Sequence, residues 1–176
     1  MDDLIEDELQ IMEEQSQGQL KVLSGETFET LIEKMKLMSP ICFEETISLK
    51  EVIGVMQDKN IGSIMLTHKG KLTGIFTERD VLRKVIGKVA DLAKTSVKTV
   101  MTPQPTSLLM SDKIAYVMNN MHVGGYRHVP IVDESEHPVA IVSIKDVLRF
   151  ILDYFPENVL NITDTPYRGP AHREGA

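Results

Sequence analysis

The feature that most constrains this chain is an internal repeat built around a strand-to-helix junction. The first copy, KLTGIFTERDVLRKVIG, spans residues 71–87, and the second reads HPVAIVSIKDVLRFILDYF. In each copy a short apolar strand is followed by apolar residues at helical spacing. The junctions carry Thr77-x-x-Asp80 and Ser143-x-x-Asp146, at an offset of 66 residues (143 − 77). Two such copies predict two similar folded units.

These junctions have two compatible interpretations. A hydroxyl followed three residues later by a carboxylate is the capping-box pattern, which starts a helix. A hydroxyl beside free helix N–H groups can also bind a phosphate, and a carboxylate can accept hydrogen bonds from ribose hydroxyls. Because the repeat extends well beyond the junctions, each junction is a candidate ligand site as well as a helix cap.

The similarity continues upstream of the junctions. The triplet MSP at Met38 returns as MTP at Met101, at an offset of 63 (101 − 38). A predicted helix follows in each half, and its apolar positions match at an offset of 62 (111 − 49), pairing Leu49, Val52, Ile53 and Met56 with Ser111, Ile114, Ala115 and Met118. Each half of about 55–60 residues is too small to bury its own sheet. We therefore expect an α/β (α+β) fold of two β-α-β-β-α repeats packed about a pseudo-twofold axis.

The domain organisation follows from the repeat. Residues 1–35 are expected to be an N-terminal acidic, helical extension, with a short helix over Thr27–Met35. The first repeat is expected at 36–95 and the second at 96–155. The tail, 156–176, is polar and rich in Pro and Gly, which predicts that it is mostly disordered.

Composition excludes several classes of function. The 176 residues include 26 acidic and 19 basic side chains, a net charge of −7, which disfavours nucleic acid as a partner. Cys42 is the single cysteine and cannot form an internal disulfide. No apolar run is long enough to span a membrane, and the acidic start MDDLIEDELQ is unlike a signal peptide. A cytoplasmic protein with no membrane partner is expected.

Catalysis and metal binding have little support in the sequence. Neither Ser143 nor Cys42 has an evident arrangement of a histidine and an acid that would make it a nucleophile. The five histidines are scattered without the i, i+4 helical spacing of a metal site. We expect no enzyme activity and no required cofactor.

The ordered set of motifs resembles a tandem pair of CBS domains, the regulatory modules named after cystathionine β-synthase and also called Bateman modules. The resemblance covers about residues 36–153 and rests on the MSP and MTP triplets, the GIFTERD and AIVSIKD junctions, and YRHVPIVD. It implies two clefts between the repeats that bind adenine-containing molecules. The implied ligand is AMP, ADP or ATP, with S-adenosylmethionine or NAD as alternatives.

The resemblance also implies which residues bind the ligand. The first cleft would use Thr77 and Asp80 for ribose and phosphate, with Arg79 at a phosphate and with Ile41, Phe43 and Ile64 around the base. The second cleft would use Ser143 and Asp146, with Ile144 over the base, Lys145 supplying charge, and Thr106, Val129 and Pro130 near the base. Arg127 and His128 match a basic pair that could serve either cleft.

The chain departs from the family pattern in three places. Met65 stands where the second strand usually carries proline, and Gly62 and Ser63 stand where the second half has its basic pair. The second half is also expected to carry about three extra residues within 123–126. The glycines there permit close backbone approach, so this insertion is either a widened turn over a ligand or a bulge.

Two functions follow from the resemblance. The first is non-catalytic energy sensing, in which a bound adenine nucleotide bridges the halves and an unidentified protein client responds to the conformational change. The second is a dimerisation or docking scaffold with empty clefts, whose N-terminal segment holds the partner. In either case we expect a homodimer formed through exposed helices.

Overall fold

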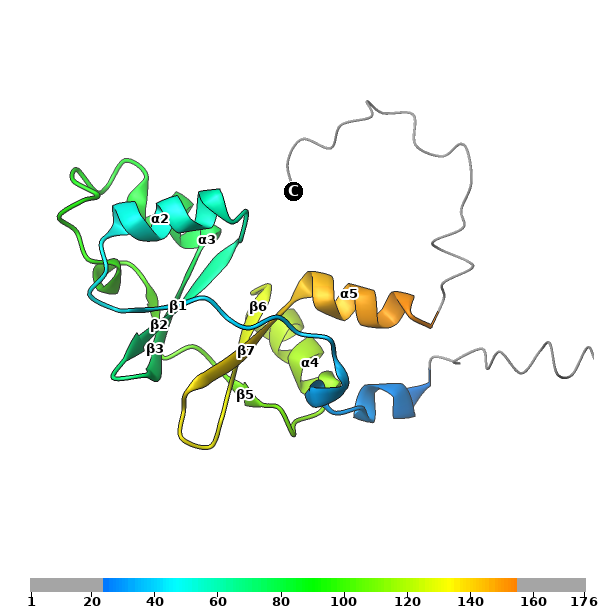
Figure 1. Ribbon diagram of the computed structural model, residues 1–176. Coiled ribbons are helices and arrows are strands. Elements are labelled where there is room, and N and C mark those ends of the chain that lie inside the picture. The colour runs from blue at the N-terminus through cyan, green and yellow to red at the C-terminus, as the bar shows by residue number, and fades with distance from the viewer. Residues whose placement is uncertain (1–23, 155–176) are drawn as a thin grey trace, which may run out of the picture. The chain divides into compact units, whose positions relative to one another are not determined.

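The computed structural model describes residues 24–154 and shows the same element order in both halves (Figure 1). The first half contains β1 (Cys42–Glu44), α2 (Leu49–Asp58), β2 (Ser63–His68), β3 (Lys71–Thr77), α3 (Glu78–Asp80) and the π-helical η3 (Val81–Val85). The second half contains β5 (Leu108–Leu109), α4 (Ile114–Gly124), β6 (His128–Val132), β7 (Pro138–Ser143) and α5 (Ile144–Leu152). The predicted mixed fold of two β-α-β-β-α repeats is confirmed.

Each half has its own sheet. In the first, β1 pairs in parallel with β2, and β2 pairs antiparallel with β3. In the second, β5, β6 and β7 repeat this arrangement. A short strand, β4 (Thr102–Pro103), comes from the start of the second repeat but joins the first sheet beside β3. The two sheets are therefore linked by a strand that belongs to the second repeat but pairs with the sheet of the first.

The predicted alignment of the two helices is wrong by three positions. The buried residues of α2 and α4 match at an offset of 65 (114 − 49), pairing Leu49, Val52 and Met56 with Ile114, Val117 and Met121. The residues that end these helices in the left-handed conformation, Asn60 (φ 50) and Gly125 (φ 64), share this offset (125 − 60). There is thus no insertion at 123–126. The two extra residues (65 − 63) lie upstream, between the MTP triplet and β5.

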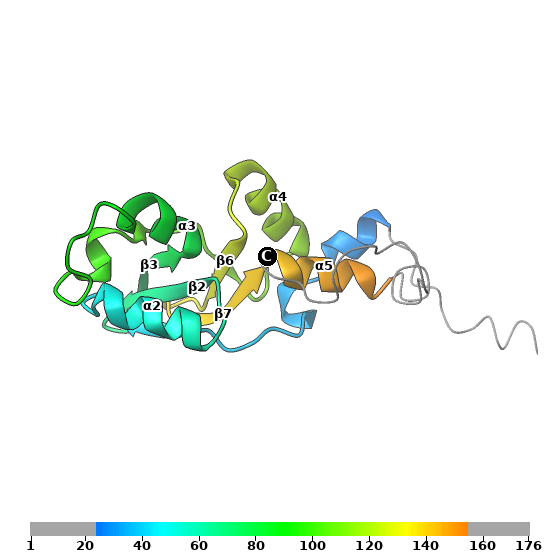
Figure 2. The ribbon, with the colours of Figure 1, turned by 90° about the horizontal axis from the view of Figure 1, so that it is seen from above.

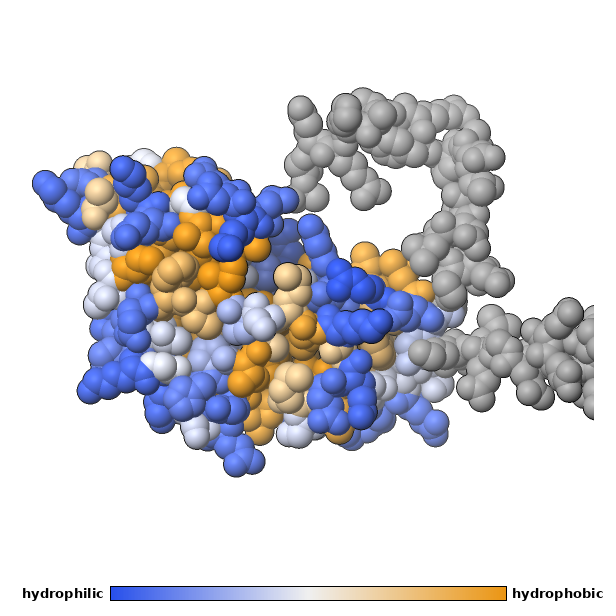
Figure 3. Space-filling model, viewed as in Figure 1, coloured by the Kyte–Doolittle hydropathy of each residue, from blue (hydrophilic) through white to orange (hydrophobic). Residues whose placement is uncertain are grey.

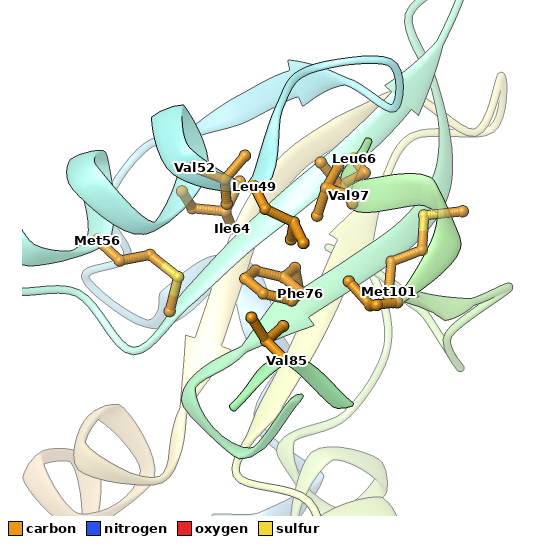
Figure 4. Close-up of a cluster of buried hydrophobic side chains, with 10 residues drawn as sticks. Leu49, Val52, Met56, Ile64, Leu66, Phe76, Val85, Val97 and Met101 are labelled. Atoms are coloured by element: carbon orange, nitrogen blue, oxygen red, sulfur yellow. The ribbon is translucent and has the colours of Figure 1, made fainter. Parts of the chain in front are cut away.

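The core of the first repeat gathers around Phe76, whose side chain is completely buried (Figure 4). Helix α2 covers one side of the sheet, as both ribbon views show (Figures 1 and 2). The cluster combines apolar side chains of α2, β2 and β3 with Val85 and with Val97, Val100 and Met101 from the start of the second repeat. The Met101 side chain packs closely on Gly74, where a Cβ would lie 2.4 Å from Met101 Sδ. The first core is therefore completed by the second repeat.

Two segments, here called the lead segments, lie upstream of the MSP and MTP triplets: 24–35 contacts the second half, and 91–100 contacts the first half. The amide of Leu49 in α2 donates to Thr95 O at 2.9 Å, and the amide of Ile114 in α4 donates to Thr30 O at 2.9 Å. These two bonds match at the offset of 65 (95 − 30). The first lead segment thus caps α4, and the second caps α2.

The predicted helix over Thr27–Met35 is wrong. Two 3-10 helices, η1 (Gly25–Glu29) and η2 (Ile32–Lys34), replace it. Leu31 between them is extended and forms a β-bridge with Lys113. Pairing with the second repeat therefore overrides the local helical pattern. The rest of the predicted acidic extension (1–23) and the whole of the predicted tail (156–176) lie outside the described residues.

The second lead segment is held by a buried carboxylate. Glu45, at the end of β1, is 5% exposed and forms an ion pair with Lys98. Its backbone oxygen accepts a hydrogen bond of 2.8 Å from Ser96 Oγ. The third 3-10 helix, η4 (Val97–Thr99), continues from this anchor toward the core. The anchor fixes where the chain enters β4, and β4 forms one wall of the candidate site.

Candidate functional site

Both predicted junctions form capping boxes. Thr77 donates to Asp80 Oδ2 from its backbone N at 3.0 Å and from Oγ1 at 2.8 Å. Ser143 donates to Asp146 Oδ2 in the same way, at 2.8 Å from N and 2.6 Å from Oγ. The capping interpretation is confirmed at both sites. The cap uses one carboxylate oxygen of each aspartate. Whether a junction can also bind a ligand therefore depends on the residues around it.

A cleft of about 370 Å³ opens at the first junction. This volume lies within the range of small-molecule sites, about 300–1,000 Å³. The first half contributes Gly62, Ile75 and residues 77–80. The second contributes Thr102, residues 104–106, Gly124 and residues 126–128. The cleft therefore lies where the two repeats meet.

Six of the predicted site residues line this one cleft, namely Thr77, Arg79, Asp80, Thr106, Arg127 and His128. The prediction that grouped Thr106 with Ser143 and Asp146 does not match this geometry. Strand β4 pairs with β3, so residues 104–106 follow the first junction and not the second. Arg127 and His128, which the sequence could not assign to a cleft, lie at the first junction.

The residues expected around the base in the first cleft lie elsewhere. Ile64 has no exposed surface and packs in the core with Phe76. Phe43 lines a separate shallow groove beside α2, and Ile41 packs against the core cluster. Because alternate strand residues point to opposite faces, Ile64 faces α2 and is shielded from the cleft.

The remaining predicted residues also lie outside this cleft. Val129 and Pro130 are buried in β6. Ile144 is 44% exposed and Lys145 is exposed, both at the start of α5, next to the capping box of Ser143 and Asp146. The first cleft therefore gathers most of the polar predicted residues and none of the apolar ones.

Charged side chains of both signs line the cleft, namely Arg79 and Arg127 beside the carboxylates of Glu78 and Asp80. Arg79 Nη1 donates to Gly125 O at 2.6 Å. Within residues 24–154, neither Arg79 nor Arg127 forms an ion pair with a carboxylate. Burial, and then the neighbouring charge of Arg127, lower the pKa of His128, while Glu78 and Asp146 oppose this shift. At neutral pH the imidazole is therefore uncharged, and the two guanidinium groups provide the positive charge.

Sequence reasoning missed several residues of the cleft, among them Tyr126. Its ring lies against the end of α4, where a Cβ on Gly124 would be 2.0 Å from Tyr126 Cε1. The glycine pair is thus a helix cap that makes room for an aromatic wall, and neither a bulge nor an inserted turn. The two glycines could have indicated the end of this helix. The three-position error in aligning the two helical sequences concealed that role. Glu78, Thr102 and Gln104 carried no signal of their own.

Two similar sheets are joined by β4, and a cleft lies at the first strand-to-helix junction. These features define a tandem α/β repeat module. The chain belongs to the CBS domain family, whose model matches residues 34–87 and 97–153. The family predicted from the motifs is confirmed.

Similar proteins share this architecture. The chain is 31% identical over 134 residues to the CBS domain-containing protein CBSCBSPB5 of Arabidopsis thaliana. The matched region covers 74% of this chain but only 24% of the Arabidopsis protein. The CBS domain pair of protein MJ0100, solved in complex with 5′-methylthioadenosine and S-adenosyl-L-methionine, is 25% identical with a TM-score of 0.61, covering 69% of this chain and 99% of that one. The CBS domain protein PAE2072 from Pyrobaculum aerophilum, complexed with AMP, has the same fold at 22% identity and a TM-score of 0.63, covering 72% of this chain and 99% of that one.

The part of the chain that the structure describes contains neither a candidate membrane-spanning helix nor a candidate metal site. Between residues 24 and 154, no helix has the length and apolar character needed to cross a membrane. Over the same residues, no three His, Cys, Asp or Glu side chains are grouped so that they could hold a metal ion.

Proposed function

We propose that this chain is a regulatory module that binds an adenine nucleotide in the cleft at Thr77 and Asp80. The observation that carries the proposal is that one cleft combines this junction with Arg79, Arg127 and His128. The adenosyl ligands of MJ0100 and the AMP of PAE2072 support this class of ligand. Ribose hydroxyls would bond to Asp80, and a phosphate would lie between the two arginines, which favours the phosphate-bearing ligands AMP, ADP, ATP and NAD over S-adenosylmethionine.

The proposed role is non-catalytic. Burial raises the pKa of the Cys42 thiol, so the single cysteine is a poor nucleophile. A nucleotide that contacts both halves can shift their arrangement only by its different affinity for the two states, and a protein client would respond to that shift. We propose a cytoplasmic location, since a chain with one cysteine needs no oxidising compartment.

A thermal-shift titration tests the proposal. AMP at 100 times its dissociation constant should stabilise the wild-type protein by about 2.7 kcal/mol, seen as a higher melting temperature. Asp80→Asn should abolish most of this rise. Asp146→Asn is the matched control, because it alters the other capping box by the same atom and should keep the rise.

Both variants lose part of a cap, so each melting temperature is compared with that of the same variant without ligand. Equal responses of the two variants would contradict the assignment to the Asp80 cleft. No rise with AMP, ADP, ATP, NAD or S-adenosylmethionine would leave the scaffold function as the better proposal.

A specific observation also supports the homodimer. Leu82 is 70% exposed and Leu148 is 54% exposed, and they occupy matching positions in the two halves (148 − 82 = 66). On the face shown in Figure 3, apolar patches lie among charged side chains. We propose that the segments after the two junctions meet those of a second copy.

Leu82→Glu should weaken self-association by at least about tenfold, because a buried interface carboxylate would lack a partner. Sedimentation equilibrium measures the effect over a range of protein concentrations. Arg83→Glu is the control on the same exposed segment. If the wild type sediments as a monomer, or if both variants dimerise normally, this interface is wrong.

A further inference from the structure

Lys84 has contacts that the family motif does not explain. Its Nζ lies 2.7 Å from Asp80 Oδ1 and donates to Thr102 Oγ1 at 3.3 Å and to Met101 O at 3.2 Å. Asp80 belongs to the first junction, whereas the other two partners begin the second repeat. One ammonium group thus joins the candidate ligand site to the segment that crosses between the halves.

Lys84 occupies the carboxylate oxygen that the cap leaves available. The cap of Thr77 uses Asp80 Oδ2, while Oδ1 accepts from Lys84 and, at 3.2 Å, from Thr102 Oγ1. Asp80 is only 6% exposed. Because a carboxylate oxygen has two acceptor sites, a ribose hydroxyl that reaches Oδ1 must displace one of these donors.

The local backbone is unusual at this position. Lys84 lies in η3, where the amide of Ile86 donates to Val81 O at 3.0 Å, five residues back. Such π-helical turns are rare and often occur at functional sites. The second half has Phe150 at the matching position (150 − 84 = 66), which cannot donate a hydrogen bond. The lysine contact and the π turn are therefore specific to the first junction.

The segment that Lys84 holds has few other bonds to the first sheet. Strand β4 is two residues long and pairs through Gly74 with Pro103 and through Ile75 with Thr102. Beyond it, the amide of Gln104 donates to Thr73 O at 2.9 Å. Proline has no N–H to add to this ladder. Loss of the Lys84 contacts should therefore loosen residues 101–106, which also line the cleft.

We propose that Lys84 is a latch that a ribose displaces. Without ligand, Lys84 occupies Asp80 Oδ1 and holds the 101–106 segment on the first half. A ribose hydroxyl on Asp80 Oδ1 displaces the ammonium group of Lys84 and releases the segment that Lys84 holds, so occupancy of the cleft changes the link between the repeats. This inference rests on the proposed function and adds a competing residue and a route for the signal.

The test compares Lys84→Met with Lys88→Met. Lys88 also donates to a backbone oxygen, Arg83 O at 2.6 Å, but Arg83 does not line the cleft, whereas Lys84 contacts Asp80 and Thr102, which do. Calorimetric titration uses adenosine, which has ribose hydroxyls but no phosphate, and 2′,3′-dideoxyadenosine, which lacks both hydroxyls. Lys84→Met should bind adenosine about tenfold more tightly than wild type, with no gain for the dideoxy compound, because only a hydroxyl competes with the ammonium.

Hydrogen exchange provides the second measurement. Amides of 101–106 should exchange faster in ligand-free Lys84→Met than in wild type, and at a rate close to that of adenosine-bound wild type. Lys88→Met should match wild type. Weaker adenosine binding by Lys84→Met, or unchanged exchange in 101–106, overturns the latch. If the wild type binds no adenosine-containing compound, the proposed function fails. Faster exchange of 101–106 in ligand-free Lys84→Met would still show that Lys84 holds this segment.

Discussion

Replacing Phe76 with alanine should lower the free energy of unfolding by about 3–5 kcal/mol. Phe76 is the largest of the fully buried side chains, at the centre of the cluster between α2 and the start of the second repeat (Figure 4). Truncation removes its transfer free energy and leaves a cavity that close-packed neighbours fill only partly. Chemical denaturation followed by circular dichroism measures the loss.

The control for this substitution is Val123→Ala. Val123 is 75% exposed on α4, so its truncation should change the free energy of unfolding by less than about 0.5 kcal/mol. Because Val97 and Met101 bring the second repeat into the first core, Phe76→Ala should shift one cooperative transition and not split it into two. A loss below about 1 kcal/mol, or separate transitions for the two halves, would contradict this description of the core.

Local patterns were predictable from the sequence because their causes are local. The short apolar strands and the two capping boxes depend on residues within a few positions of one another. The junctions at Thr77 and Ser143 therefore formed as expected. The alignment of α4 failed because apolar residues recur at three- and four-residue spacing in that helix, so a shift of three positions gives a similar pattern.

The long-range pairings could not be predicted in the same way. Thr30 and Thr95 bond to α4 and α2 through backbone atoms, which every residue type carries. Likewise, nothing local indicates that β4 pairs with β3, and this pairing places Thr106 at the first junction. Motifs identified Arg79, Asp80 and Arg127 but missed Glu78, and the grouping of all four depends on which segments the fold brings together.

Arg127→Ala should weaken AMP binding by about 10- to 150-fold, since charge-assisted hydrogen bonds contribute about 1.5–3 kcal/mol each. Arg127 lines the cleft and is exposed, and among the described residues it has no ion pair that would occupy its guanidinium. The matching position in the first half is Gly62 (127 − 62 = 65), which offers no substitute. Burial is the larger cause of the lowered pKa of His128 and remains in the variant, so it still disfavours a charged imidazole that could replace the lost guanidinium.

Comparison of ligands separates recognition of the phosphate from a structural role of Arg127. Adenosine lacks the phosphate, so its affinity should change by less than about twofold in Arg127→Ala, and Arg83→Ala should leave AMP binding unchanged. Salt should weaken AMP binding to wild type more than to the variant, because screening acts on the charge that the variant lacks. Calorimetric titration at two salt concentrations measures both effects. If adenosine and AMP lose affinity equally, Arg127 shapes the cleft, and the phosphate lies elsewhere.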